Sequence, residues 1–216
     1  MYLEIHDAVK KIGPDIVLDH VDLSLEQGMV CGIQGENGSG KSMLMRAVCG
    51  LILLNSGTVT VGGKTIGREI SFPGSLGALI ENPGFLNGYT GYRNLKILAD
   101  IRHEIGENEI RTAMERIDLS DAAEKKYRKY SLGMKEKLGI AAAIMERPEL
   151  IVLDEPTNAL DEDSRNLLWR IIHEERERGA LVLVSCHNSD ELEPVADVLY
   201  EMRNGKIREK GGGGIL

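Results

Sequence analysis

The stretch MVCGIQGENGSGKSMLMRAV, residues 29–48, decides the fold class of this chain. Its first six residues are mostly apolar and predict a buried strand. GENGSGKS follows at 35–42 and fits the pattern Gly-x-x-x-x-Gly-Lys-Ser. Apolar residues then recur at helical spacing and supply the buried face of a helix that begins near Lys41: Leu44, Ala47, Val48 and Leu51. A strand, a glycine-rich turn and a helix in this order predict a loop that holds the phosphates of a nucleotide.

The positions of this loop have distinct chemical roles. Its glycines let backbone N–H groups approach phosphate oxygens without a Cβ in the way, and the start of the helix adds partial positive charge. Lys41 supplies a mobile positive charge for the β- and γ-phosphates, and the hydroxyl of Ser42 can ligate Mg²⁺. We expect nucleotide contacts from the whole loop: Gly35, Glu36, Asn37, Gly38, Ser39, Gly40, Lys41 and Ser42.

Two buried strands are predicted in the last third of the chain, and polar residues follow each. LIVLDEP places Asp154 and Glu155 at the end of a uniformly apolar run, and ALVLVSCH places His187 after another. Ligands bind at the carboxyl ends of the strands in open parallel sheets. Asp154 is therefore expected to hold a metal ion, directly or through water, and Glu155 to orient or deprotonate an attacking water. His187 lies where it would reach a γ-phosphate.

YSLGMKEKLGIA, at 130–141, predicts a second helix start suited to an anion. Ser131 is expected to be the N-cap, and the exposed N–H groups near Gly133 would attract negative charge. The alternative is an ordinary N-cap without a ligand. From this sequence alone, both interpretations remain open.

The remaining pattern predicts one α/β domain over residues 1–210. Residues 2–34 alternate between apolar and polar side chains, which is typical of antiparallel strands. Residues 84–146 have helical spacing and are expected to form a helical subdomain. VLYEMRNGKIREK predicts a hairpin around Asn204-Gly205, and residues 211–216 are expected to be a flexible tail.

Composition limits the partners and the compartment. The net charge of −8 argues against a nucleic-acid partner. Three scattered cysteines without a Cys/His cluster indicate reduced, buried thiols. The N-terminus has acidic residues where a signal peptide would be apolar, and no stretch approaches the ~20 apolar residues of a membrane helix. We therefore expect a cytoplasmic protein that does not itself cross the membrane.

The order of GENGSGKS, YSLGMKEKLGIA, LIVLDEP-TNALD and SCH resembles the ATP-binding subunit of bacterial ABC transporters, over about residues 2–210. The resemblance implies a P-loop NTPase of ABC type, with an N-terminal antiparallel β subdomain, a mostly parallel core sheet and an inserted helical subdomain. It also implies hydrolysis of ATP with Mg²⁺, a homodimer or heterodimer of such domains, and a separate transmembrane permease. The subunit would lie on the inner face of the cell membrane.

The resemblance also implies roles for individual residues. In this family each ATP is held between the phosphate loop of one copy and the signature helix of the other, so Ser131 and Gly133 would contact the γ-phosphate of the partner's nucleotide. Asp161, in TNALD, would lie at the dimer seam. Glu155 would be the general base, and His187 would contact the γ-phosphate.

Four positions depart from the family pattern. Glu81 stands where the family has a glutamine that senses Mg²⁺ and contacts the membrane partner, and we expect Glu81 to serve as a metal ligand and in catalysis. Leu132 and Met134 replace the first glycine and the glutamine of the signature. Ile12 stands where an aromatic residue usually stacks on adenine.

ALIENPGF and the sequence around YSLGMK are similar to the ATPases of bacitracin- and lantibiotic-type exporters. This similarity implies export of a peptide antibiotic or another amphiphile. Apolar residues in the loop after Glu81 would then either receive the permease or belong to the core: Phe85, Leu86 and Tyr89.

Two functions other than a transport ATPase predict features that this sequence does not show. A soluble ABC-type ATPase in regulation or DNA maintenance predicts a coiled coil, a second cassette or a basic face, and the sequence shows none of these. A P-loop kinase would have no use for YSLGMK or His187.

Overall fold

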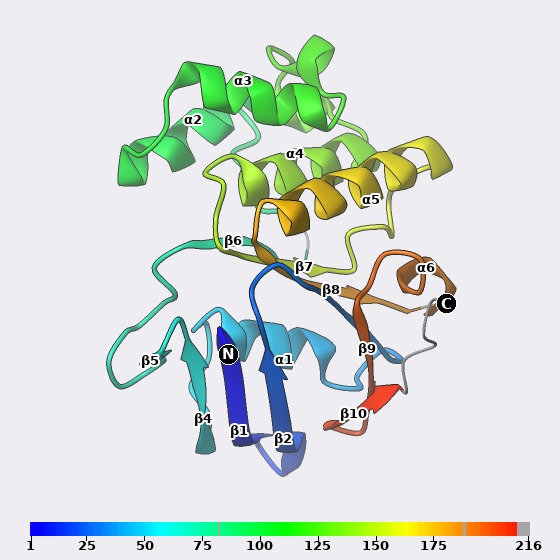
Figure 1. Ribbon diagram of the computed structural model, residues 1–216. Coiled ribbons are helices and arrows are strands. Elements are labelled where there is room, and N and C mark those ends of the chain that lie inside the picture. The colour runs from blue at the N-terminus through cyan, green and yellow to red at the C-terminus, as the bar shows by residue number, and fades with distance from the viewer. Residues whose placement is uncertain (82, 188, 211–216) are drawn as a thin grey trace.

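Two β-sheets of different kinds organise the chain (Figure 1). The computed structural model describes residues 1–81, 83–187 and 189–210. The first sheet has the order β2–β1–β4–β5, with strands β1 (Leu3–Ile12), β2 (Asp15–Leu25), β4 (Ser56–Val61) and β5 (Lys64–Thr65). The second has the order β10–β9–β3–β8–β7–β6, with strands β3 (Val30–Gln34), β6 (Leu76–Leu79), β7 (Leu150–Asp154), β8 (Leu181–Cys186), β9 (Val198–Arg203) and β10 (Lys206–Lys210).

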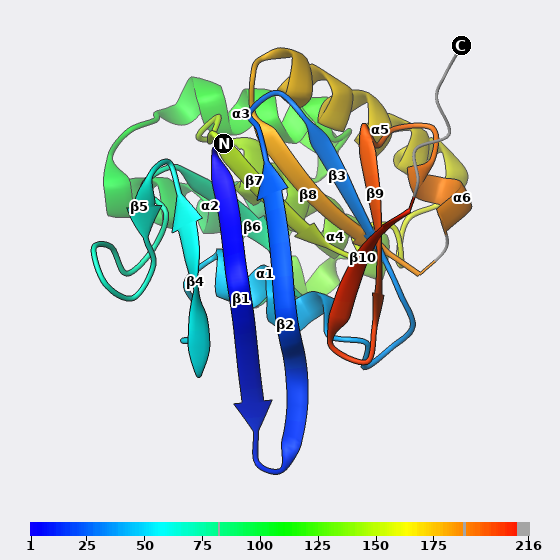
Figure 2. The same ribbon diagram turned by 60° about the horizontal axis from the view of Figure 1, so that its bottom comes forward.

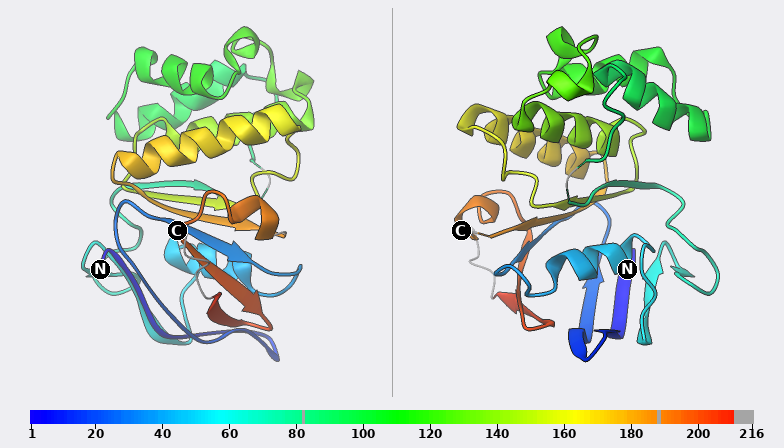
Figure 3. Two further views of the ribbon diagram at one scale, coloured as in Figure 1. Left: turned by 45° about the vertical axis from the view of Figure 1, so that its right-hand side comes forward. Right: turned by 180° about the vertical axis from the view of Figure 1, so that it is seen from behind.

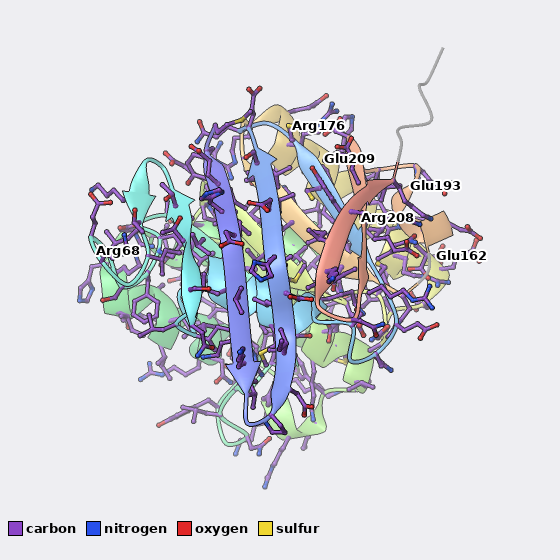
Figure 4. All side chains as sticks on the ribbon, turned by 90° about the horizontal axis from the view of Figure 1, so that it is seen from below. Arg68, Glu162, Arg176, Glu193, Arg208 and Glu209 are labelled. Atoms are coloured by element: carbon purple, nitrogen blue, oxygen red, sulfur yellow. The ribbon has the colours of Figure 1, made fainter. Side chains whose placement is uncertain are left out.

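The first sheet is antiparallel and faces solvent on one side. Along β1, Leu3 and Ile5 are buried while Glu4 and His6 are exposed, which is the alternation expected of a sheet packed on one face. Figure 4 looks onto this sheet from below. Arg68 marks the side of β5, and Arg208 and Glu209 mark β10 on the other side.

The second sheet is parallel from β9 to β6 and has helices on both faces. Every residue of β7 and β8 is buried, as the uniformly apolar sequence predicts. Helix α1 (Lys41–Val48) contacts β2, β4 and β7 and lies between the two sheets, as Figures 2 and 3 show. Helices α4 (Leu132–Ile144) and α5 (Glu162–Glu177) cover the opposite face.

The other helices lie farther from the sheets or at their edge. Figure 1 shows α2 and α3 stacked on the outer side of α4, and α6 at the edge near β9. Their bounds are α2 (Gly91–Arg102), α3 (Glu107–Arg116) and α6 (Ser189–Leu192), with two short 3-10 helices, η1 (Ser120–Ala122) and η2 (Tyr127–Lys129). No helix within the described ranges is long and apolar enough to cross a membrane.

The predicted fold class is confirmed: the chain forms an antiparallel sheet and a mostly parallel sheet with helices on both faces. The hairpin at Asn204-Gly205 has both residues at positive φ, 49° and 77°, as its sequence predicts. The prediction that residues 84–146 form a separate subdomain stays a prediction, although α2, α3 and α4 all lie within that range. The predicted tail at 211–216 lies outside the described residues.

The structure differs from the sequence prediction at the end of α1 and at β6. Leu51, expected on the buried face of α1, is 56% exposed because the helix ends at Val48 and Gly50, at φ 75°, turns the chain. Strand β6 was not predicted. It packs against α4 so closely that a Cβ on Gly77 would lie 1.7 Å from the carbonyl oxygen of Ala143.

Candidate active site

The glycine-rich loop joins β3 to α1, and its backbone is left open toward an anion. Gly40 is the N-cap of α1 at φ 112°, and it has no side chain to cap the first N–H groups of the helix. A Cβ on Gly35 would lie 2.4 Å from the carbonyl oxygen of Met202, so only glycine fits there. The loop therefore presents N–H donors and a helix start without obstruction.

Lys41 connects this loop to the end of β7. Its side chain is 4% exposed, and Nζ donates to the carbonyl oxygens of Gly35, at 2.7 Å, and Glu36, at 3.2 Å. The same nitrogen lies 3.2 Å from Oε1 of Glu155. The structure thus brings together two residues that the sequence assigned to one site from motifs more than a hundred positions apart.

Glu155 follows β7 at φ 54°, and three side chains surround its carboxylate. Its Oε2 lies 2.9 Å from Nε2 of His187 and accepts a hydrogen bond of 2.8 Å from Asn158, while Lys41 contacts the other oxygen. Burial disfavours the charged form of the Glu155 carboxylate. Hydrogen bonds from Asn158 and Lys41 and the charges of Lys41 and His187 outweigh it and lower the pKa of Glu155. The carboxylate is therefore ionised near neutral pH and available to accept a proton.

Asp154 is held by a hydroxyl on the neighbouring strand. The register pairs Asp154 with Ser185 of β8, whose Oγ donates 2.6 Å to Oδ1 of Asp154 and accepts 2.9 Å from the backbone N–H of Glu155. Ser185 is wholly buried. One serine therefore fixes both acidic residues at the sheet edge.

The acidic residues face a cavity of about 300 Å³ beside the start of α1. Its walls come from the loop, the β6–α2 connection, α4 and the end of β7: Asn37, Ser42, Glu81, Leu132, Glu136, Asp154, Glu155, Asn158 and Ala159. Glu81 is at φ 58° and forms an ion pair of 2.5 Å with Arg46 of α1. The expected metal ligands Ser42, Asp154 and Glu81 thus share one cavity.

The residues expected to serve a second nucleotide lie elsewhere. Ser131, Gly133 and Asp161 border another cavity of about 300 Å³, formed by the start of α4 and the start of α5. Ser131 is the N-cap of α4, its Oγ accepting 3.2 Å from the N–H of Met134. Asp161 is the N-cap of α5, and hydrogen bonds from Ser164 lower its pKa. The single chain therefore does not bring these three residues to its own phosphate loop.

Sequence reasoning missed three residues that line the cavity of Asp154 and Glu155 or support its carboxylates. Asn158 and Ser185 hold the acidic pair, and Glu136 of α4 borders the cavity while only 7% exposed. Burial raises the pKa of Glu136 to about 7. Ser185 carried a readable signal, because it ends the apolar run of β8 as Asp154 ends that of β7; Glu136 carried none.

The site fits a nucleoside triphosphate. Within the described residues, Oγ of Ser39 in the loop is buried without a hydrogen-bond partner, which is a costly arrangement unless a ligand supplies one. The described residues contain no group of three or more His, Cys, Asp or Glu side chains placed to hold a metal by themselves. The hydroxyl of Ser42 and the carboxylates of Asp154 and Glu81 suit Mg²⁺, which takes few protein ligands and completes its shell with phosphate oxygens and water.

Comparison with known proteins gives the family. A family model described as ABC transporter matches residues 18–158. The chain belongs to the ABC transporter family. Within that family it is an ATP-binding, ATP-hydrolysing subunit, and transport is supported over the non-transport alternative. The resemblance drawn from its four motifs is thereby confirmed.

Three relatives illustrate the similarity. YybJ of Bacillus subtilis (strain 168), an uncharacterized ABC transporter ATP-binding protein, is 39% identical over 95% of this chain and 94% of its own length. The bacitracin transport ATP-binding protein BcrA of Enterococcus faecalis is 36% identical over 96% of this chain and 68% of its own. A solved ATP-binding subunit of an ABC transporter superposes with a TM-score of 0.88 at 25% identity, covering 99% of this chain and 90% of that one.

Proposed function

We propose that this ABC subunit binds Mg·ATP between two copies of the cassette and drives a separate membrane permease from the inner face of the membrane. The cargo we propose is a peptide antibiotic or another amphiphile. The observation that carries the catalytic part is the ionised carboxylate of Glu155, placed between Lys41 and His187 beside the phosphate loop.

In this proposal Glu155 is the general base. It accepts a proton from the attacking water, which requires the carboxylate to be ionised and within hydrogen-bond reach. His187 contacts the γ-phosphate, and Lys41 leaves Glu155 to meet the phosphates. Ser42, Asp154 and Glu81 would hold Mg²⁺, which when bound supplies positive charge against the charge that develops on the phosphate.

The dimer is supported by the position of Ser131, Gly133 and Asp161, which border a cavity that no residue of the phosphate loop lines. Ser131, Gly133 and Asp161 present an N-capped helix start and a carboxylate on a surface that the chain's own loop does not share. A second copy facing the first would place that surface against the partner's nucleotide. Each copy would then supply half of two sites, and a single copy would be a poor catalyst.

The permease contact is supported by apolar side chains in the loop after Glu81. Leu86 is 51% exposed and Tyr89 is 47% exposed. Phe85 is only partly buried and packs edge-on against Tyr127, with ring centroids 5.4 Å apart. We assign Leu86 and Tyr89 to the permease contact and Phe85 to the support of this loop. The cargo class is supported by the similarity to BcrA, whose name gives bacitracin transport.

Replacing Glu155 tests the catalytic assignment. Glu155→Gln keeps the shape of the side chain and removes its basicity, so turnover should fall by ~10²–10⁴ while ATP binding is retained. The exposed Glu193 serves as the matched control, because Glu193→Gln makes the same chemical change outside the site. Near-normal turnover in Glu155→Gln would remove Glu155 from its proposed role.

Dilution tests the dimer, and purification tests the permease. Turnover per molecule should drop as the isolated protein is diluted below its association threshold, and constant turnover would contradict the shared site. Purification from native membranes should recover the subunit with a polytopic membrane protein. Substituting Leu86 and Tyr89 by serine should weaken that association without changing ATP binding.

A further inference from the structure

Glu81 brings a negative charge to a place where the family has an uncharged glutamine, and the structure shows what accompanies that charge. The carboxylate of Glu81 pairs with the guanidinium of Arg46 at 2.5 Å. The Arg46 side chain is 28% exposed and that of Glu81 is 61% exposed, so the pair lies at the mouth of the cavity in reach of solvent. A carboxylate in this position can therefore change partners without leaving a buried charge unpaired.

The position of Arg46 on α1 links it to the expected metal site. Arg46 follows Ser42 by four residues, so the two side chains lie one turn apart on the same face of the helix. Neighbours at this spacing have Cβ atoms about 5–6 Å apart. Glu81 also borders the cavity that contains Ser42 and Asp154. The carboxylate held by Arg46 and the hydroxyl proposed to ligate Mg²⁺ thus border the same cavity.

The negative charge of each other acidic residue in this cavity is paired with a cation, stabilised by a hydrogen-bond donor, or reduced by protonation. Lys41 pairs with Glu155, and the hydroxyl of Ser185 donates to Asp154. Burial favours the neutral form of Glu136. Glu81 has Arg46. A nucleotide adds several more negative charges to the same space, so an unbalanced carboxylate at Glu81 would repel it.

We propose that Arg46 is a positioning residue of the ATP site and that Glu81 exchanges Arg46 for Mg²⁺ when metal and nucleotide bind together. The proposal rests on the nucleotide site proposed above. Before exchange, Arg46 keeps the carboxylate beside the metal position and screens the phosphates from it. After exchange, Arg46 is free of Glu81. A glutamine needs no such counter-ion, so the pair is a consequence of the carboxylate in this chain.

The test measures nucleotide affinity with and without metal, so it does not depend on turnover. Binding of the non-hydrolysable analogue AMP-PNP to Arg46→Gln is compared with wild type in Mg²⁺ and in EDTA. In EDTA, affinity should fall by about three- to tenfold, because the carboxylate is left without a counter-ion near the phosphates. In Mg²⁺ the loss should be less than about twofold, because the metal offsets the same charge. High salt should reduce the EDTA effect.

A double substitution separates this role from a structural one. In a Glu81→Gln background, Arg46→Gln should leave the EDTA affinity unchanged, because no carboxylate remains to be screened. Arg111→Gln is the control for net charge, since Arg111 forms an i,i+4 pair of 2.7 Å with Glu107 on α3, outside the cavity. Arg46→Lys keeps a cation and should retain most of the wild-type ratio of the two affinities. Thermal melting of each variant reports folding.

Two results would overturn the proposal: an EDTA affinity that Arg46→Gln leaves unchanged, or an equal loss in the Glu81→Gln background. If Arg46→Gln does not fold, Glu81→Gln alone decides. Glu81→Gln should bind AMP-PNP in EDTA at least as tightly as wild type, and Mg²⁺ should increase its affinity less than it increases that of wild type. A weaker affinity in EDTA than wild type would refute the argument that Glu81 repels the phosphates. Failure of wild type to bind nucleotide under any condition would instead refute the proposed function.

Discussion

Glu136 should make the stability of this protein depend on pH, and Glu136→Gln should remove that dependence. The side chain lies on α4, is 7% exposed and borders the cavity that contains Asp154 and Glu155. Burial raises its pKa from an ordinary value of 4.5 to about 7. Between pH ~4.5 and ~7, the folded protein therefore holds a proton on Glu136 that the unfolded chain has released.

The size and the sign of this effect on stability follow from the difference between the pKa values of Glu136 in the folded and unfolded states. Because the pKa in the folded state lies above the unfolded value, the stability from this group is fully present below 4.5 and is lost as pH rises through 7. The upper limit on the free energy of unfolding that this group contributes is about 3 kcal/mol, since a tenfold change in proton affinity corresponds to about 1.4 kcal/mol. We expect about 2 kcal/mol, because the carboxyl borders an open cavity that water screens. Glutamine keeps the size of the side chain and carries no charge at any pH in this range.

Urea unfolding at a series of pH values measures the effect. The stability gained by Glu136→Gln should be small near pH ~4.5, grow up to pH ~7 and then level off at about 2 kcal/mol. The exposed Glu115 of α3 is the control, because Glu115→Gln makes the same substitution where the side chain stays in water. A difference between wild type and Glu136→Gln that stays flat across the range, or that grows toward acid, would refute the reasoning.

Three further predictions concern packing and the support of the site. Gly77→Ala should cost more than about 3 kcal/mol in urea unfolding, because its Cβ would overlap a carbonyl oxygen of α4, whereas Gly74→Ala meets no atom within 4 Å and should cost little. Glu175→Ala should cost about 1–3 kcal/mol by the same assay, because Arg116 and Arg178 lose their buried partner but keep Glu174 and the carbonyl oxygen of Pro148. Ser185→Ala should lose about 1–3 kcal/mol by thermal melting and raise the Mg²⁺ concentration needed for nucleotide binding, because Asp154 loses the hydroxyl that orients it.

The parts of the site that depend on local sequence could be predicted. The strand, turn and helix around GENGSGKS are fixed by residues within a few positions of one another, and α1 begins at Lys41 as expected. Ser131 caps α4 for the same reason, since an N-cap bonds to an N–H three residues later. Asn204-Gly205 likewise sets its own turn.

Other parts depend on contacts between distant segments. The role of Ser185 follows from the register of β8 against β7, which no motif encodes. Strand β6 has only four residues, and its place at the sheet edge depends on the close approach of Gly77 to α4. Glu136 is polar in sequence yet buried, because the packing of α4 against the cavity wall, and not the helical pattern, decides its exposure. The end of an apolar run marks the position of Ser185, but apolar spacing does not report which residues Ser185, Gly77 or Glu136 contact.

Two cations of helix α1 pair with carboxylates that line the same cavity. Lys41 contacts Glu155 at the end of β7, and Arg46, five residues later, contacts Glu81 after β6. Both carboxylates have proposed roles that require them to face water or metal instead of a cation. The proposed roles therefore require both pairs to break when nucleotide and metal bind, so that Lys41 contacts the phosphates and Glu81 leaves Arg46. Metal and nucleotide should therefore bind cooperatively, and Arg46→Gln should increase that cooperativity, because the unpaired carboxylate of Glu81 weakens nucleotide binding more in the absence of metal than in its presence.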